Sequence, residues 1–426
     1  MSERGMSPRA RPRHAAPPSP RRLAMRGALL GIAMGVSNVL SYLFVVVLAP
    51  ALGPADFGGY SAMSTYGILL AIPAGAFQVV IARHLAADRP TSGLRPAFAI
   101  GVALAAGTAL LAPLLRSAFH LDSVLAPVLL GLTLVPMTLT GAFQGLLLGT
   151  ERVRRLSSLY IVTAAGRFGG AALAAALGAD VTQVFAILLA ASALTTLWGW
   201  LLCHDLVARL ASSTPGLLAE LARSNTTLAA FMALTNVDVL LARHFLSAHE
   251  SGGYALASTF GRAVCWATQF VALLLVPRMQ SHGAARVRLK ASGLVLAIGL
   301  CAVGVVALAP RMWISLAGGE QYTEFSGLAV ACVALGTTWA LAQVWLFSEM
   351  GGDSGFLGAL TWVVLAAQAL TIGLWWHDSA RQIVTVCAVG ALVVAVTGLV
   401  RTLIAHQSEQ PIDETSALAA TDGTRA

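Results

Sequence analysis

Long apolar stretches alternate with short polar segments along almost the whole chain. Each stretch is close to the ~20 residues that a helix needs to cross the hydrocarbon core of a bilayer. The sequence shows no alternating strand pattern, and lipid admits only helices or closed barrels. The pattern therefore predicts an all-α polytopic membrane protein with twelve transmembrane helices, at residues 27–49, 58–82, 96–115, 124–148, 156–178, 181–203, 224–244, 253–277, 290–309, 325–347, 355–376 and 382–404.

Two polar tails flank this region. Residues 1–22, rich in Pro, Arg and Ser, and residues 406–426 are too polar to bury a core, so both are expected to be disordered. The first apolar run, residues 27–49, is longer than the apolar region of a signal peptide and is interpreted as an uncleaved first span. Six spans then fall in an N-lobe, residues 23–205, and six in a C-lobe, residues 206–405.

An octapeptide occurs twice at half-chain spacing. It reads GGYSAMST at residues 58–65 and GGYALAST at residues 252–259, with five of the eight positions identical. Each copy opens a predicted span, and the two spans are six helices apart. An even offset gives both copies the same direction across the membrane, which indicates parallel six-helix repeats related by an axis along the membrane normal. We refer to these segments as the two copies of the repeated octapeptide.

The composition supports a membrane location and an orientation. The chain is 57% hydrophobic and 11% charged, whereas soluble domains carry about 25% charged residues. With the N- and C-termini on the cytoplasmic side of the plasma membrane, 21 of the 27 Lys and Arg residues fall on that side and four on the other. This positive charge is scattered over short loops, without a basic helix bearing interleaved aromatics, so a nucleic-acid partner is not expected.

Three charged residues fall inside predicted spans, where charge is costly and tends to be functional. Asp238 in the seventh span and Arg262 in the eighth span belong to one helical hairpin and are expected to approach each other. They form either a structural ion pair or a switch in which Asp238 takes up a proton or sodium ion and releases Arg262. Arg167, in the fifth span, has no obvious partner. If Arg167 and Arg262 both face a central cleft, they present two planar cations to an anionic cargo.

Uncharged amides at membrane depth extend this candidate site. We expect Asn38, Gln78, Asn236 and Gln269 to help bind the substrate in a hydrated cavity, while hydrogen bonding between helices is the alternative. The five cysteines lie in apolar stretches without metal-binding spacing, and no metal site or cofactor is expected. The short loops leave no room for a soluble catalytic domain, so the chain is not expected to be an enzyme.

Three segments carry a resemblance to a known family. The run Leu52–Tyr60 resembles the signature that follows the first helix of oligosaccharide flippases, which are polysaccharide transporters of the superfamily that also contains the MATE drug exporters and the lipid II flippase. The segment Asn236–Arg243 and the pair Pro277–Arg278 are similar to that family too, and the likeness extends over nearly all of residues 26–405. Unlike MATE drug exporters, the first span has Asn38 rather than a carboxylate, and the two extra C-terminal helices of the lipid II flippase are missing.

The resemblance implies a two-lobe, MATE-like transporter that works by alternating access. Its relatives move lipid-linked glycans, usually on a polyprenyl diphosphate, from the inner to the outer leaflet, with an H⁺ or Na⁺ gradient as the drive. A flippase of this kind, acting as a monomer in the lipid membrane beside a glycan polymerase or glycosyltransferases, is therefore expected. The alternatives are a MATE-like drug or metabolite exporter, a membrane glycosyltransferase, which the few acidic loop residues Asp56, Glu320 and Glu324 disfavour, and a non-transporting envelope component.

Overall fold

The computed structural model describes residues 20–89, 91–208, 210, 220–221, 226–275, 284–349 and 355–408. The predicted tails lie almost entirely outside the described residues, as does Pro277–Arg278. The secondary structure is helical. The helices are α1 (Pro20–Leu70), α2 (Ile72–Ala86), α3 (Leu94–Ala118), α4 (Leu125–Gly149), α5 (Val153–Leu177), α6 (Val181–Val207), α8 (Thr226–Leu234), α9 (Val237–Phe245), α10 (Ala248–Leu275), α11 (Ala284–Leu308), α12 (Pro310–Gly318), the 3₁₀ helix η2 (Glu320–Phe325), α13 (Ser326–Glu349), α14 (Phe356–Leu374) and α15 (Ala380–Ser408).

The predicted fold class is confirmed. Within the described residues, ten helical segments are long and apolar enough to cross a membrane. The first of them covers 60 residues and contains the first and second predicted spans, while α10 supplies the predicted eighth span. Within the described residues, each predicted span therefore lies largely in helix, although α10 is not among those ten segments. The sequence pattern missed α12 and η2, two short helices in the connection between the ninth and tenth spans.

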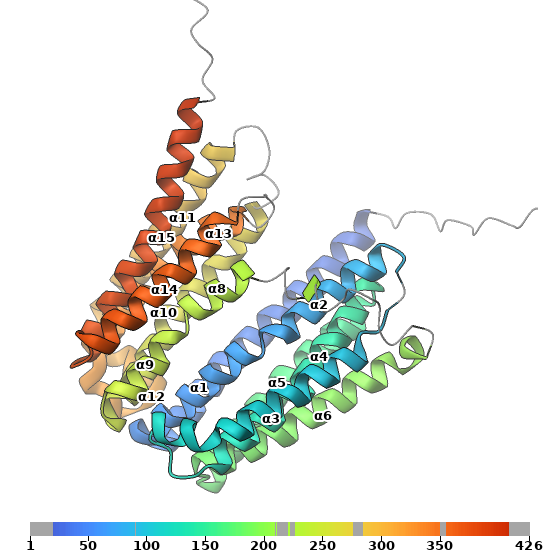
Figure 1. Cartoon of the computed structure of the whole chain (residues 1–426), viewed down its shortest axis with the longest axis horizontal. Helices are drawn as coiled ribbons and strands as arrows, with labels where there is room; N and C mark the ends of the chain where they lie inside the picture. The colour runs from blue at the N-terminus through green and yellow to red at the C-terminus, as the bar shows by residue number, and fades with distance from the viewer. Residues whose placement is uncertain are drawn as a thin grey trace, which may run out of the picture.

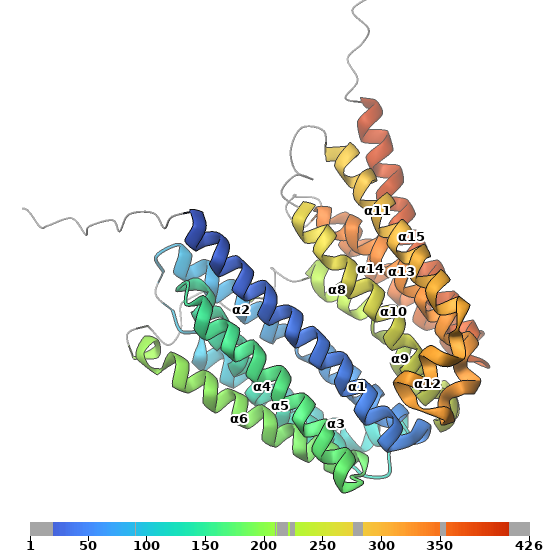
Figure 2. The ribbon, with the colours of Figure 1, turned by 180° about the vertical axis from the view of Figure 1, so that it is seen from behind.

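The helices form two bundles, α1–α6 and α8–α15, that meet at one end and diverge toward the other (Figures 1 and 2). The start of α1 and the end of α15 both lie at the diverging end, which we call the terminal end. The opposite end contains Gly53, the C-terminus of α3, the α9–α10 connection and η2, and we call it the closed end. One hydrophobic core runs through both bundles, while a second core lies between α2, α3, α4, α5 and α6 of the N-lobe and also includes Leu221.

A backbone break separates the first two spans. Gly53 has φ 73° and ψ 169°, which lies outside the helical region and favours glycine. The chain resumes as helix directly at Pro54, a residue that is well tolerated in the first turn of a helix. The loop between these spans is therefore much shorter than the sequence pattern predicts, and it places the first copy of the repeated octapeptide at the closed end.

The two copies of the repeated octapeptide pack against each other where the lobes meet. A Cβ atom on Gly252 would lie 1.7 Å from the carbonyl oxygen of Pro54, and one on Gly58 would lie 2.9 Å from the backbone nitrogen of Gly252. Only hydrogen at both α-carbons allows these two backbones to approach so closely. The glycines that begin each copy are thus explained by contact between the lobes rather than by a local turn.

We therefore expect Gly252→Ala to destabilise the protein through overpacking, by about 1–3 kcal/mol, because the obstructing atoms belong to rigid backbone. Thermal unfolding in detergent measures this effect. Gly107→Ala is the matched control, since a Cβ at Gly107 meets nothing within 4 Å. Equal melting temperatures for Gly252→Ala and Gly107→Ala would contradict the proposed steric role.

Candidate functional site

The predicted seventh span is interrupted by a turn at Thr235 and Asn236, which separates α8 from α9. The side-chain amide of Asn236 donates to the carbonyl of Met232 at 2.7 Å, and the hydroxyl of Thr235 donates to the carbonyl of Phe231 at 3.1 Å. Irregular backbone at membrane depth requires protein partners for its polar groups. The carbonyl of Thr235 finds one in Nε of Arg262, at 3.0 Å.

Arg262 and Asp238 form an ion pair beside this turn. Nη2 of Arg262 lies 2.9 Å from Oδ1 of Asp238, and the Asp238 side chain is fully buried. Tyr254 donates to the second carboxylate oxygen at 3.0 Å, while Arg262 donates from Nη1 to the hydroxyl of Ser258 at 2.9 Å and lies 5.8 Å from the ring of Trp339. The predicted contact between the two charges is confirmed. Such buried charges are tolerated only when paired and hydrogen-bonded.

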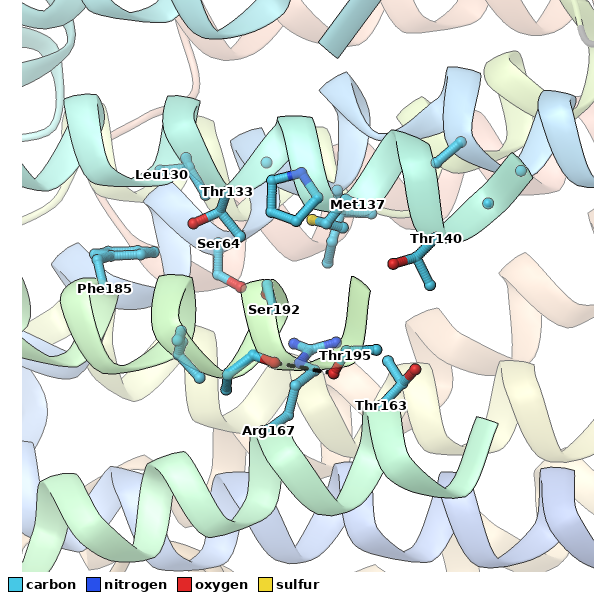
Figure 3. Close-up of a pocket in the computed structure, with 18 of the residues that line it drawn as sticks. Ser64, Leu130, Thr133, Met137, Thr140, Thr163, Arg167, Phe185, Ser192 and Thr195 are labelled. Atoms are coloured by element: carbon cyan, nitrogen blue, oxygen red, sulfur yellow. Dashed lines mark hydrogen bonds between the residues drawn. The ribbon is translucent and has the colours of Figure 1, made fainter. Parts of the chain in front are cut away.

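A separate cavity of about 230 Å³ lies within the N-lobe, between the second half of α1, α2, α4, α5 and α6. Figure 3 shows Arg167 of α5 pointing into this space. Among the described residues, no Asp or Glu lines the cavity. Most of its polar lining consists of hydroxyl groups, with one amide, from Tyr60, Ser64, Thr133, Thr140, Gln144, Thr163, Ser192 and Thr195.

The charge of Arg167 is left available to this cavity. Its guanidinium carbon lies 5.6 Å from the ring centroid of Phe44, and the hydroxyl of Tyr60 lies near enough to interact with it electrostatically. Arg167 is exposed and makes no ion pair within the described part of the chain. Since a guanidinium carries five donors, several remain free for an acceptor that occupies the cavity.

Residues of the repeated octapeptide lie beside the intramembrane charged residues of both lobes. The tyrosine at its third position and the serine at its seventh position are Tyr60 and Ser64 in the first copy and Tyr254 and Ser258 in the second. In the N-lobe the tyrosine interacts electrostatically with Arg167. In the C-lobe the tyrosine contacts the aspartate of the ion pair and the serine contacts the arginine. Equivalent positions of the repeat thus form the polar surroundings of one intramembrane arginine in each lobe.

The two arginines lie on different sides of α1 rather than together in one cleft. Phe44 of α1 packs beside Arg167, whereas Tyr42 is within electrostatic range of Arg262. Residues two positions apart on a helix point about 200° away from each other, so α1 stands between the two charges. In this conformation the two arginines do not face one shared cleft, which is the arrangement that the sequence analysis considered.

The four amides predicted to bind substrate are dispersed. Asn38 is exposed on α1, and Gln269 is half-buried in α10. Gln78 donates to the hydroxyl of Tyr160 at 2.6 Å, which joins α2 to α5. Asn236 is buried and stabilises the turn between α8 and α9. The structure therefore gives Gln78 and Asn236 the hydrogen bonds that the alternative interpretation expected, and their part in binding remains a prediction.

Arg243 is a polar residue whose position the sequence did not reveal. It stands at the end of the seventh predicted span, residues 224–244, and counts among the four basic residues expected on the non-cytoplasmic side, yet it is only 5% exposed at the closed end. The available signal was its place at the end of the segment 236–243, which carries part of the family resemblance. No group of three or more His, Cys, Asp or Glu side chains suited to a metal ion occurs among the described residues.

Comparison with solved structures identifies the fold. The chain is similar to an outward-facing MATE family multidrug resistance transporter of the MOP superfamily, with 14% identity, TM-score 0.55, and 91% of this chain and 96% of that chain covered. It is equally similar to a MOP superfamily transporter from Pyrococcus furiosus described as having a binding pocket of reverse polarity, with 14% identity, TM-score 0.54, and 90% and 95% covered. A MATE protein in complex with MaL6 gives 14% identity, TM-score 0.60, and 90% and 96% covered.

No family model matches the sequence, and no curated protein matches it either. The fold is therefore that of MATE transporters, and the chain is a multi-pass membrane protein. At this level of identity the likeness concerns the fold, so the cargo has to be argued from the chain's own residues.

Removing one partner of the Asp238–Arg262 pair should be costly. We expect Arg262→Ala to destabilise the protein by about 3–5 kcal/mol, because it leaves a buried carboxylate unpaired. The double variant Arg262→Gln/Asp238→Asn should lose less stability than Arg262→Gln and Asp238→Asn lose together as single variants. These three variants and the wild type form a double-mutant cycle. Thermal unfolding of the four proteins in this cycle measures the coupling, and strictly additive effects would show that the contact contributes nothing.

Proposed function

We propose that this protein is a flippase that moves a lipid-linked oligosaccharide, carried on a polyprenyl diphosphate or a related anionic carrier, across the membrane by alternating access. The observation that supports this most directly is the N-lobe cavity, which combines a lining of hydroxyls with the guanidinium of Arg167, a group that has no ion pair in the described part of the chain. The MATE fold supplies a frame in which transport of some kind is expected.

The chemistry of the cavity favours an anionic, sugar-bearing cargo. A guanidinium is planar, permanently charged and able to bind a phosphate through two parallel hydrogen bonds. The hydroxyls of Thr133 and Thr163 donate to the carbonyls of Leu129 and Leu159 and keep lone pairs that can accept hydrogen bonds from the hydroxyls of a glycan. A polar headgroup that crosses hydrocarbon without such partners loses several kcal/mol for each unsatisfied group. A lined cavity removes that cost, while the lipid tail stays in the bilayer.

The shape of the molecule suggests the direction of loading. The lobes diverge toward the terminal end, where α1 begins and α15 ends, and the distribution of basic residues favours the cytoplasm for that end. Under this orientation the described conformation would receive a carrier from the cytoplasmic leaflet of the plasma membrane and release it on the other side. Enzymes that build or polymerise the glycan are the natural partners.

The second candidate is a MATE-like exporter of drugs or metabolites, which the structural neighbours favour. A cationic drug would need a carboxylate or an aromatic cage, but among the described residues no Asp or Glu lines the N-lobe cavity. The Pyrococcus furiosus transporter described as having a pocket of reverse polarity indicates that this fold accommodates pockets of different charge.

Arg167→Ala should abolish translocation of the glycolipid, because the headgroup loses its cationic partner, and Arg167→Lys should retain partial activity. A fluorescent polyprenyl-diphosphate-linked saccharide in proteoliposomes, quenched from outside by a membrane-impermeant reagent, measures translocation. Arg381→Ala is the matched control, since Arg381 is an exposed arginine outside the cavity. Wild-type rates in Arg167→Ala, or export of a cationic dye without glycolipid movement, would reject the proposal in favour of the drug exporter.

Asp238 is the proposed site of coupling to an H⁺ or Na⁺ gradient, since uptake of a cation there would weaken its hold on Arg262. Asp238→Asn keeps the size of the side chain and removes its charge, so we expect translocation that no longer responds to an imposed gradient. The same proteoliposomes with and without a pH or sodium gradient measure this response. Gradient dependence equal to that of the wild type would leave Asp238 with a structural role only.

A further inference from the structure

The side chain of Arg243 forms hydrogen bonds that join the two lobes. Its guanidinium donates from Nε to the carbonyl of Phe119 at 2.8 Å, from Nη2 to the carbonyl of His120 at 3.1 Å and from Nη1 to the carbonyl of Ala55 at 3.0 Å. All three acceptors belong to the N-lobe, whereas Arg243 belongs to α9 of the C-lobe. A single side chain thus ties α9 to two separate segments of the other lobe.

Two further bonds fix the side chain within its own lobe. Nη1 of Arg243 also donates to the carbonyl of Ala248 at 3.3 Å and to the hydroxyl of Ser251 at 3.1 Å. Ser251 immediately precedes the second copy of the repeated octapeptide. The guanidinium is therefore held in a defined orientation when the lobes meet, and its three cross-lobe bonds lose little further side-chain entropy.

The acceptors are arranged to attract a cation. Phe119 is the C-cap of α3, where the carbonyls at a helix end carry partial negative charge. Asp56 and Asp122 of the N-lobe interact electrostatically with Arg243, and both line a pocket of about 140 Å³ next to it. Within the described residues, neither carboxylate is close enough to form an ion pair with Arg243. The bonds to the guanidinium thus come from carbonyls and one hydroxyl, with the carboxylates adding a longer-range attraction.

Glycine in the first copy of the repeated octapeptide makes room for this side chain. A Cβ on Gly58 would lie 3.0 Å from Nη1 of Arg243, and one on Gly59 would lie 3.3 Å from Nη2. Two hydrogen bonds between neutral groups also join the lobes at the closed end. Tyr322 donates to the carbonyl of Ala49 at 3.1 Å, and Gln321 donates to the carbonyl of Pro50 at 3.0 Å.

We propose that Arg243 is the latch of the closed end: its bonds to the N-lobe carbonyls hold the lobes together there, and the molecule opens on that side only when these bonds are exchanged for water. The latch acts on the conformational equilibrium and touches no cargo. Arg243 lies at the closed end, opposite the terminal end where the lobes are apart. Loss of its bonds to the N-lobe and approach of the lobes at the terminal end are therefore two parts of one movement.

The test uses the full-length protein in lipid nanodiscs, without any cargo. The five native cysteines are replaced, and spin labels are placed at Ser117 and Glu320, which are exposed at the closed end of the N-lobe and the C-lobe. Electron–electron double resonance then measures the distance between the lobes. The wild type should give one short-distance population. Arg243→Ala should raise the ratio of long-distance to short-distance populations by on the order of tenfold or more, because charge-assisted hydrogen bonds between the lobes are lost.

A second pair of labels at Arg154 and Arg286, exposed at the terminal end, should show the opposite change. Arg311→Ala is the control, since it removes an exposed positive charge from α12 at the closed end. Arg243→Lys keeps the charge with fewer donors and should give an intermediate ratio, and it replaces the alanine variant if the latter does not elute as a single species. Unchanged distances in Arg243→Lys or Arg243→Ala would overturn the latch. The outcome is independent of the proposed cargo, because none is present.

Discussion

The closed end of this molecule depends on two backbones that approach each other more closely than any side chain would permit. Gly252 touches the carbonyl of Pro54, and Gly58 lies against the backbone of Gly252. This contact brings α10 against the first helices of the N-lobe, and it places Ser251 and Ala248 where they can bind the guanidinium of Arg243. The orientation of the lobes, their shared hydrophobic core and the divergence at the terminal end all follow from a seam that only glycine can form.

Three arginines in this fold illustrate different ways to bring a permanent charge into an apolar protein. Arg262 is neutralised by a carboxylate, and Arg243 is satisfied mainly by main-chain carbonyls. Arg167 alone among these three faces a cavity with most of its donors free. Because a guanidinium cannot release its proton under ordinary conditions, it needs a partner of opposite charge or strong acceptors. Arg167 makes no ion pair among the described residues, and for this reason it is the arginine that we propose for the cargo.

Much of the fold could be predicted from the sequence because hydrophobic length is a strong and local signal. The spans and the pairing of Asp238 with Arg262 depend on apolar runs and on two residues in one hairpin, and both are present in the structure. The break at residues 235–236 and the short helices α12 and η2 depend on single hydrogen bonds and local turns, which apolar periodicity does not encode. The burial of Arg243 could not be predicted, because hydropathy does not distinguish an exposed arginine at the end of a span from one buried between lobes. The expectation that Arg167 and Arg262 share a cleft depended on helix rotation, which uniformly apolar spans leave undetermined.

The repeated octapeptide meets its own copy across the seam, and this has a consequence for how the chain tolerates change. In a symmetric dimer of identical subunits, one surface patch faces itself, so each residue is selected for compatibility with its own equivalent. The contact of Gly58 with Gly252 has that self-complementary character inside a single polypeptide. Because both halves belong to one chain, their other surfaces need not match, and the surroundings of Arg167 and Arg262 do differ. The seam has less freedom, because a larger residue in either half collides with the backbone of the other.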